Sequence, residues 1–337
     1  MSKKILILKN DRGGDLINSI KSISSLLTKK NNVTICLSRL NGGFAFLFKG
    51  AIIKIINGNL NIFNKLNIFY LILKNKYDEV YILTPKNFYY FLPIFFYKIK
   101  FFAITVDGTS RNRPYKFLRK FLYRYITISR TVVNKKSSSE LQLDLTSYNN
   151  VIDIDLKNIS PPKLDDYIKN NIPVNFLFIQ YKENFYDKIN LNMENFDLLL
   201  NKLNQKHKYI IFSSDIENTL SNEFFLKRYS FIDCLKKDIQ FNNIDPKIIY
   251  LHKINSENLF ALIKNAKFIL SPHGLLTHIS KFYKKKSINL FNIIINNKND
   301  VLHHKIAFSE WYKNSNMKFL FLDSNINKSL KKISKNI

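Results

Sequence analysis

Short apolar segments alternate with longer helix-forming stretches along the first part of the chain. Apolar runs rich in Ile, Leu, Val and Phe predict buried β-strands. They cover Lys4–Leu8, Val33–Leu37, Ile52–Ile56, Glu79–Leu83 and Lys100–Val106. Helices are expected between them at Asp15–Thr28 and Leu60–Lys76. Strands that alternate with helices form βαβ units, so this pattern predicts a parallel sheet.

The same alternation begins again after a break in composition. Ser160, Pro161 and Pro162 interrupt both periodicities and indicate a linker. Further strands are predicted at Val174–Ile179, Tyr209–Ser213, Lys247–Leu251, Lys267–Leu270, Ser287–Phe291 and Lys318–Leu322. The helices expected among them are Met193–Lys206, Ser256–Asn265 with Ser256 as its N-cap, and Leu275–Tyr283.

This repetition predicts an α/β protein with two Rossmann-like, doubly wound domains. The expected domains are residues 1–150 and 173–337, joined by a linker at 151–172. In open sheets of this kind, ligands bind beyond the carboxyl ends of the strands. Loops from both domains are therefore expected to face one cleft.

Composition supports two cores and adds a large positive charge. The 337 residues are 46% hydrophobic, which excludes a disordered chain. The 53 Lys and Arg residues exceed the 25 Asp and Glu residues, which gives a net charge of +28. Such a charge suits nucleic acid, anionic lipid or a phosphorylated substrate, although the abundance of Lys and Asn also reflects codon bias. Because no zinc module, RNA-binding aromatic motif or basic reading helix is found, no nucleic-acid partner is expected.

Cysteine usage and hydropathy suggest the compartment. Cys36 and Cys234 stand alone in different halves of the chain, without metal-ligand spacing or a disulfide framework, which suits a reducing cytoplasm. The N-terminal apolar run is too short for a signal peptide. The most hydrophobic window, Phe88–Val106, contains Pro93 and two lysines, so we expect contact with a membrane interface at most, not a spanning helix.

A loop with two glycines follows the first predicted strand. It contains Asp11, Arg12, Gly13 and Gly14 and ends at Asp15. The glycines allow the backbone to turn sharply and approach a ligand. Asp15 would then stand near the start of a helix, as a general base or as a helix N-cap. From the spacing alone, the N-cap is favoured.

A second loop joins a strand to a helix at Ser271–His278. Unpaired N–H groups at the start of a helix form an anion site, and His273 or His278 could add hydrogen bonds to a departing phosphate. His278 taken singly also suits packing within the helix. Since the loop has no Cys and no third ligand, a metal site is not expected.

Charged residues follow two further strands of the second half. Asp215 and Glu217 follow the strand at Tyr209–Ser213, where a carboxylate could hold ribose hydroxyls or start the next helix. Lys182 and Lys188 follow the strand at Val174–Ile179 and are candidate phosphate partners.

Taken together and in this order, these motifs resemble glycosyltransferase family 9, the heptosyltransferase-like enzymes. The first strand followed by Gly14 and Asp15 is similar to the family's strand, loop and catalytic Gly-Asp. The stretch from Ser256 to His278 is similar to its helix, strand and donor-binding loop. Ile210–Glu217 resembles the family strand that ends near a donor-contacting Glu. The resemblance spans nearly the whole chain.

The resemblance implies a GT-B fold in which the first domain binds the acceptor and the second binds the nucleotide sugar. It makes Asp15 the base that takes the proton of the acceptor hydroxyl, with Asp11, Arg12, Gly13 and Gly14 on the acceptor side. The sugar carbon would be inverted as nucleotide diphosphate leaves. The implied donor contacts are Lys188, with Lys182 as its alternative, Glu217, His273, Gly274, Leu275, Thr277 and His278.

The resemblance also implies partners and a location. The donor would be a nucleotide diphosphate sugar carrying a heptose or a hexose. The acceptor would be lipopolysaccharide or another surface glycan, lipid-linked or phosphorylated. No metal or other cofactor is expected. The protein would be cytoplasmic and peripheral on the inner face of the inner membrane.

The chain departs from the family pattern in the donor loop. The family has an Asp before Ser or Thr and Gly, whereas His273 precedes Gly274 here, and the Gly-to-His spacing is one residue longer. The identity of the donor sugar therefore does not carry over. The alternative function is a catalytically inert nucleotide-sugar-binding homologue or a surface-assembly scaffold. An NAD-dependent enzyme is disfavoured because the Gly-x-Gly-x-x-Gly turn is missing.

A basic and aromatic segment closes the first half. A helix is predicted at Arg113–Arg130, on which Lys116, Lys120 and Arg124 are four residues apart and share one face. With apolar residues on its other side, this helix is expected to bind the anionic membrane surface or an anionic acceptor. A solvated helix in a Lys-rich protein is the alternative.

Overall fold

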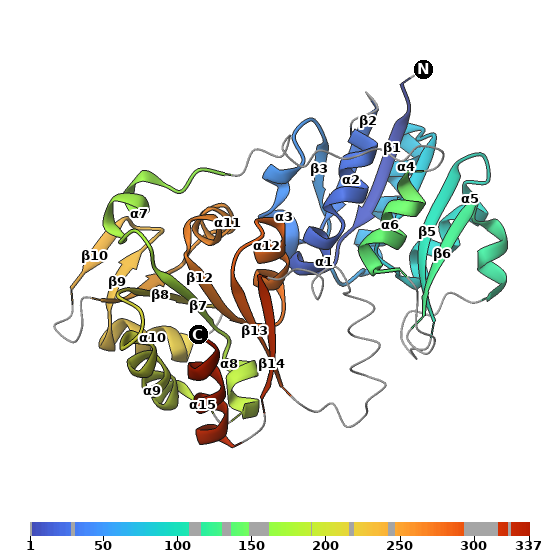
Figure 1. Ribbon diagram of the computed structural model, residues 1–337. Helices are drawn as coiled ribbons and strands as arrows, with labels where there is room; N and C mark the ends of the chain where they lie inside the picture. The colour runs from blue at the N-terminus through green and yellow to red at the C-terminus, as the bar shows by residue number, and fades with distance from the viewer. Residues whose placement is uncertain are drawn as a thin grey trace. The chain divides into compact units, whose positions relative to one another are not determined.

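The computed structural model describes residues 2–27, 31–107, 116–129, 136–147, 162–189, 191–215, 219–241, 247–292, 316–322 and 325–337. These residues divide into two compact units, the first ending at described residue 147 and the second starting at 162. Each unit is built on its own sheet (Figure 1). The end of the predicted linker carries helix α7 (Asp166–Asn171), which belongs to the second unit.

The sheet of the first unit has six parallel strands in the order β3-β2-β1-β4-β5-β6. Its strands are β1 (Lys4–Lys9), β2 (Asn32–Leu37), β3 (Ile52–Ile55), β4 (Glu79–Ile82), β5 (Lys100–Asp107) and β6 (Arg124–Ser129). The central strand β1 is buried on both faces, as expected for a parallel sheet covered by helices.

Helices cover this sheet. They are α1 (Gly13–Asn18), α2 (Ile20–Leu27), α3 (Arg39–Gly42), α4 (Ile62–Asn75), α5 (Asn87–Phe95) and α6 (Ser138–Thr146), with the 3₁₀ helices η1 (Ala45–Leu47) and η2 (Lys116–Phe121). Ile68, Ile72 and Tyr90 on α4 and α5 pack with Leu6 and Leu8 of β1 in one core. Because side chains alternate along a strand, Ile5 and Ile7 point to the opposite face.

The helix predicted at Asp15–Thr28 is divided at Ser19. Ser19 ends α1, and its hydroxyl donates to the carbonyl of Asp15 (2.9 Å) and to Oε1 of Gln142 on α6 (2.5 Å). A further polar contact with α6 comes from α2, where Ser25 Oγ lies 3.0 Å from Thr146 Oγ1. The break thus accompanies packing against a helix more than a hundred residues away.

The prediction of a helix at Arg113–Arg130 is wrong within the described residues. Lys116–Phe121 forms a short 3₁₀ helix and Arg124–Ser129 forms the edge strand β6. Arg124 pairs with Phe102 of β5, and the Thr105 and Thr127 hydroxyls meet across the two strands at 2.8 Å. The β-branched residues of β6 favour this pairing.

The expected basic face is therefore not formed. Lys116, Lys120 and Arg124 do not share a helix, since the first two lie on η2 and the third on β6. Arg119 of this segment forms an ion pair, in which its Nη2 lies 2.5 Å from Oδ1 of Asp107.

The sheet of the second unit has eight strands in the order β10-β9-β11-β8-β7-β12-β13-β14. The strands are β7 (Leu177–Tyr181), β8 (Ile210–Ser214), β9 (Ser230–Asp233), β10 (Asp238–Gln240), β11 (Ile248–His252), β12 (Phe268–Pro272), β13 (Ser287–Asn292) and β14 (Met317–Leu322). All pairs are parallel except β10 with β9, two strands that the hydrophobic pattern did not predict.

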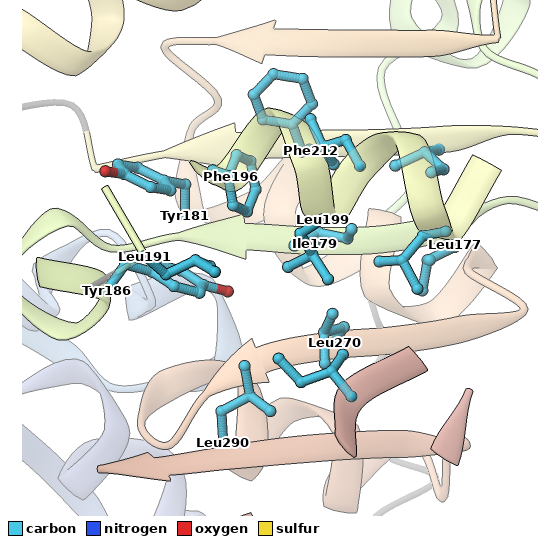
Figure 2. Packing of buried hydrophobic residues seen from close by; sticks show 14 of the residues in the cluster. Leu177, Ile179, Tyr181, Tyr186, Leu191, Phe196, Leu199, Phe212, Leu270 and Leu290 are labelled. Carbon is cyan, nitrogen blue, oxygen red and sulfur yellow. The ribbon is translucent and has the colours of Figure 1, made fainter. Parts of the chain in front are cut away.

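The remaining helices of this unit are α8 (Glu183–Tyr186), η4 (Asp187–Ile189), α9 (Met193–Asn204), α10 (Thr219–Arg228), α11 (Ser256–Asn265), α12 (Leu275–Phe282) and α15 (Ile326–Asn336). Figure 2 shows Tyr181, Phe196 and Phe212 gathered with leucines of neighbouring strands in one buried core. The N-cap of α11 is Asn255, whose Oδ1 accepts from Asn258 N at 2.8 Å, so the predicted cap at Ser256 is wrong by one residue.

No helix among the described residues is long and apolar enough to cross a membrane. Likewise, no cluster of three or more His, Cys, Asp or Glu side chains with metal-binding geometry occurs in that part of the chain.

Candidate functional site

The second unit carries a glycine loop between β12 and α12. Gly274 has φ +156° and ψ −137°, a backbone conformation that residues with a Cβ rarely adopt. Its N–H donates to Thr277 Oγ1 at 3.1 Å, and Thr277 is fully buried. Thr277 therefore shapes the loop through its hydroxyl, while the backbone of Gly274 remains close to the surface.

The two histidines of this loop differ in their surroundings. The His273 N–H donates to the Leu290 carbonyl at 2.8 Å, and its ring stacks on Phe291 with centroids 4.4 Å apart. These contacts attach the loop to the neighbouring strand β13. His278 is 8% exposed within α12, and its N–H reaches the Gly274 carbonyl at 3.4 Å. Leu275, the first residue of α12, is half-buried.

Lys182 lies beside this loop. It follows β7, which is adjacent to β12 in the sheet, and is the residue before α8. A Cβ added to Gly274 would lie 3.2 Å from Nζ of Lys182. Lys188 instead lies exposed on η4. Of the two lysines that the sequence offered for phosphate binding, Lys182 is the one that the structure brings next to the glycine loop.

A hydroxyl network that sequence reasoning missed occupies the same edge of the sheet. Ser214 at the end of β8 lies 2.6 Å from the Tyr250 hydroxyl, which donates to Asn222 Oδ1 at 2.7 Å; Ser214 Oγ also donates to this oxygen. His252 Nδ1 is 3.5 Å from the Tyr250 hydroxyl. Burial lowers the pKa of His252 below its ordinary value, although nearby Asp233 opposes the shift.

Two acidic residues were predicted beyond β8. Asp215 accepts from Gln180 Nε2 at 3.4 Å, so it is tied to β7. Glu217 lies outside the described residues. The predicted contact between Glu217 and the nucleoside stays a prediction.

In the first unit, the loop after β1 is held by polar contacts. Lys9 is almost fully buried and its Nζ lies 2.7 Å from Oδ2 of Asp11. Ser38 Oγ donates to the Asp11 carbonyl at 2.7 Å, and Asn41 Nδ2 donates to the Lys9 carbonyl at 2.8 Å. Asp11 thus anchors the loop.

Asp15 occupies the first turn of α1 and is exposed. The N-cap of α1 is Arg12, which makes no side-chain capping bond, and Gly13 and Gly14 are the first two helical residues. The interpretation of Asp15 as the N-cap is therefore wrong: Asp15 is the third residue of α1.

Lys86 supports the same loop from another element and was not singled out in the sequence. It precedes α5, and its Nζ donates to the Asn10 carbonyl at 3.4 Å and to the Gly58 carbonyl. Burial lowers the pKa of Lys86, and the nearby Asp11 carboxylate partly offsets this. The signal that could have found it is its position in the segment that joins the fourth strand to α5, beyond the carboxyl end of that strand.

The comparison with solved structures finds proteins that share this fold. No family model and no curated protein matches the sequence. The E. coli ADP-heptose lipopolysaccharide heptosyltransferase II matches with a TM-score of 0.65 and 10% identity, over 98% of this chain and 96% of that chain. A glycosyltransferase of family 9 from Veillonella parvula matches with a TM-score of 0.63 and 11% identity, over 99% and 90%.

Epimerases match as well. A UDP-N-acetylglucosamine 2-epimerase described as putative, from Listeria monocytogenes, has a TM-score of 0.60 and 8% identity, over 100% of this chain and 88% of that chain. The E. coli heptosyltransferase WaaC was solved with ADP and the S. aureus protein MnaA with UDP. At such identities the likeness shows the fold: the chain has the α/β, GT-B-like fold with two parallel sheets that these transferases and epimerases share.

Proposed function

We propose that the protein is an inverting glycosyltransferase. It moves a heptose or a hexose from a nucleotide diphosphate sugar to a lipid-linked or phosphorylated acceptor, such as lipopolysaccharide or another surface glycan. The observation that carries the proposal is the placement of Lys182 Nζ beside Gly274, at the start of a helix. A cation and backbone N–H groups at one loop suit a pyrophosphate.

The donor half of the reaction uses the second unit. Lys182 and the backbone at Gly274 and Leu275 bind the pyrophosphate, while His273 and Thr277 keep the loop in shape through their contacts with β13 and the Gly274 N–H. As the bond between the sugar carbon and the phosphate oxygen breaks, negative charge grows on the leaving nucleotide diphosphate. Lys182 stabilises that charge, and the transfer needs no metal ion.

The acceptor half uses the first unit. The Asp15 carboxylate takes the proton of the acceptor hydroxyl as its oxygen attacks the sugar carbon from the side opposite the phosphate, which inverts that carbon. The ion pair of Lys9 with Asp11 and the contacts of Ser38 and Lys86 hold the loop that presents Asp15. The remaining family assignments, Glu217 and His278 as donor contacts, belong to the same proposal, in which Lys182 takes the place of Lys188.

A screen of nucleotide sugars tests this function. The protein is first heated with ADP, UDP and a panel of their sugars, and a rise in the melting temperature identifies the nucleotide. Mass spectrometry then follows the bound sugar with and without extracts of bacterial surface glycans. A transferase releases nucleotide diphosphate and adds the sugar to the glycan. Isomerisation without release would show an epimerase, and binding without turnover would show an inert homologue or scaffold.

We also propose that the protein works in the cytoplasm, at the inner face of the inner membrane. The described cysteines Cys36 and Cys234 are both free thiols, as a reducing compartment requires. A lipid-linked acceptor would hold the reaction at the membrane surface, and the chemistry itself does not depend on that location.

A further inference from the structure

Helix α4 exposes a continuous apolar surface. Its outward residues Ile62, Phe63, Leu66, Tyr70 and Leu73, here called the α4 stripe, are each 55–71% exposed. At 3.6 residues per turn they fall within about 100° of the helix circumference. The side chains that attach α4 to the sheet, Ile68 and Ile72, point the other way and are buried. This helix is apolar on both its inner and its outer side.

The stripe continues onto the end of α5. Phe69 of α4 contacts Phe95 and Phe96, with ring centroids 5.7 and 4.7 Å apart. Phe95 and the next exposed aromatic residue, Tyr97, are 62% and 80% exposed. Exposed apolar surface that extends over two elements is typical of a binding surface and not of a solvated helix.

The two chain segments that carry the exposed apolar residues contain basic residues and no acidic ones. Residues 60–77 and 80–106 contain no Asp or Glu. Lys74 Nζ lies 5.8 Å from the Tyr70 ring and Lys98 Nζ 5.9 Å from the Tyr97 ring. The acids between these segments are engaged, since Glu79 Oε1 lies 2.5 Å from Lys3 Nζ and Asp78 Oδ2 accepts from the Lys4 N–H at 2.8 Å.

We propose that the α4 stripe binds the surface of an anionic lipid bilayer. Apolar side chains flanked by lysines and tyrosines form the pattern of interfacial helices, in which the apolar face enters the acyl boundary and the cations reach the headgroups. A second copy of the chain fits less well, because protein interfaces are depleted in Lys. The proposal does not depend on the donor or on the reaction, so lipid binding and glycosyl transfer succeed or fail separately.

The experiment is flotation of the full-length protein with vesicles of phosphatidylcholine alone or mixed with phosphatidylglycerol. The test variant is Ile62→Asn/Leu66→Asn/Leu73→Asn. The matched control is Leu198→Asn/Leu220→Asn/Leu235→Asn, which changes the same number of exposed aliphatic residues in the second unit. Melting temperatures show that all proteins remain folded.

We expect wild type and control to float with the anionic vesicles and the test variant to bind at least ~10-fold more weakly. Lys65→Glu/Lys74→Glu should weaken binding further as salt is lowered, because the reversed charges are then less screened from the lipid. Equal flotation by the test variant and the control would overturn the proposal. Absence of wild-type binding would overturn it too, and a dimer that the test variant alone abolishes would then identify a second copy as the occupant.

Discussion

Lys182 and Gly274 come from loops more than ninety residues apart, yet a Cβ on Gly274 would lie only 3.2 Å from the Lys182 ammonium. The strands that precede them, β7 and β12, are neighbours in the parallel sheet, so their carboxyl ends place the two loops together. The Lys182 ammonium therefore lies beside the backbone of Gly274.

Replacing Lys182 should weaken binding of the nucleotide diphosphate. A hydrogen bond to a charged group contributes about 1.5–3 kcal/mol, so Lys182→Ala should raise the dissociation constant for ADP or UDP by roughly 10- to 100-fold. Lys188→Ala is the matched control, since Lys188 is exposed on η4. Isothermal titration calorimetry measures the nucleotide dissociation constant of each variant. If Lys188→Ala raised the dissociation constant more than Lys182→Ala, Lys188 and not Lys182 would be the residue that contacts the phosphate.

Adding a single methyl group at Gly274 should also weaken nucleotide binding. Gly274→Ala forces a Cβ onto a strained backbone, at a cost of about 1–3 kcal/mol, and moves the Lys182 ammonium. We expect nucleotide affinity to fall beyond the loss of stability. Combining Gly274→Ala with Lys182→Ala should be less than additive, because both remove the same contact.

Gly58→Ala serves as the control for that glycine. A Cβ there would meet the Asn10 carbonyl at an ordinary 3.7 Å, so nucleotide binding should stay unchanged. If Gly274→Ala lowers the melting temperature but the folded protein binds the nucleotide as tightly as wild type, Gly274 is needed for folding and not for binding.

Variants of Asp15 and Asp11 should have different effects: the first should lower turnover and the second should lower stability. Asp15→Asn should reduce turnover by ~10²–10⁴-fold through loss of the base. Because Asp15 is exposed, the same change should lower the melting temperature only slightly. Asp11→Asn removes the partner of the buried Lys9 and should lower stability. Thermal denaturation and product formation are measured for each. Near-normal turnover by Asp15→Asn would exclude it as the base.

Stability should depend on pH through His252. Burial lowers its folded pKa, so the unfolded chain takes up a proton at a higher pH than the folded chain does. The stabilising effect is therefore complete above the ordinary histidine pKa of about 6.5 and is lost as the pH falls from there through the folded pKa. Each pH unit in that window costs up to about 1.4 kcal/mol.

Urea unfolding at pH 7.5 and 5.5 measures this effect. The loss of stability between the two pH values should be smaller in His252→Gln than in wild type. His207, whose pKa burial also lowers, remains in both proteins and cancels in the comparison. Equal losses in the two proteins would show that His252 does not carry the effect.

Most strands of both sheets could be predicted from the sequence because each is a largely apolar run, whereas β6, β9 and β10 were not predicted. The predicted Lys4–Leu8 and observed Lys4–Lys9 differ by one residue. The error at Arg113–Arg130 has a physical cause: four-residue spacing of cations indicates a helix only where no neighbouring strand competes. Arg124–Ser129 pairs with β5, a contact that local periodicity does not contain.

The candidate site was predictable in its loops and not in its contacts. The sequence indicated Gly274 and Asp15 because each follows an apolar strand. It could not choose between Lys182 and Lys188, since both follow the same strand, and the choice depends on which side chain reaches the loop after the neighbouring strand β12. Ser19, Lys86 and the Tyr250 network depend in the same way on partners distant in the chain.

The central strands of both sheets, such as Ile5–Leu8 and Leu177–Ile179, are buried on both faces. Such positions require only an apolar side chain of suitable volume, so exchanges among Ile, Leu, Val and Phe with compensating neighbours keep the fold. Selection can then replace most core residues over time without moving the loops that the strands carry. A sheet of this kind tolerates large differences in sequence at constant architecture, which is compatible with a TM-score of 0.65 at 10% identity.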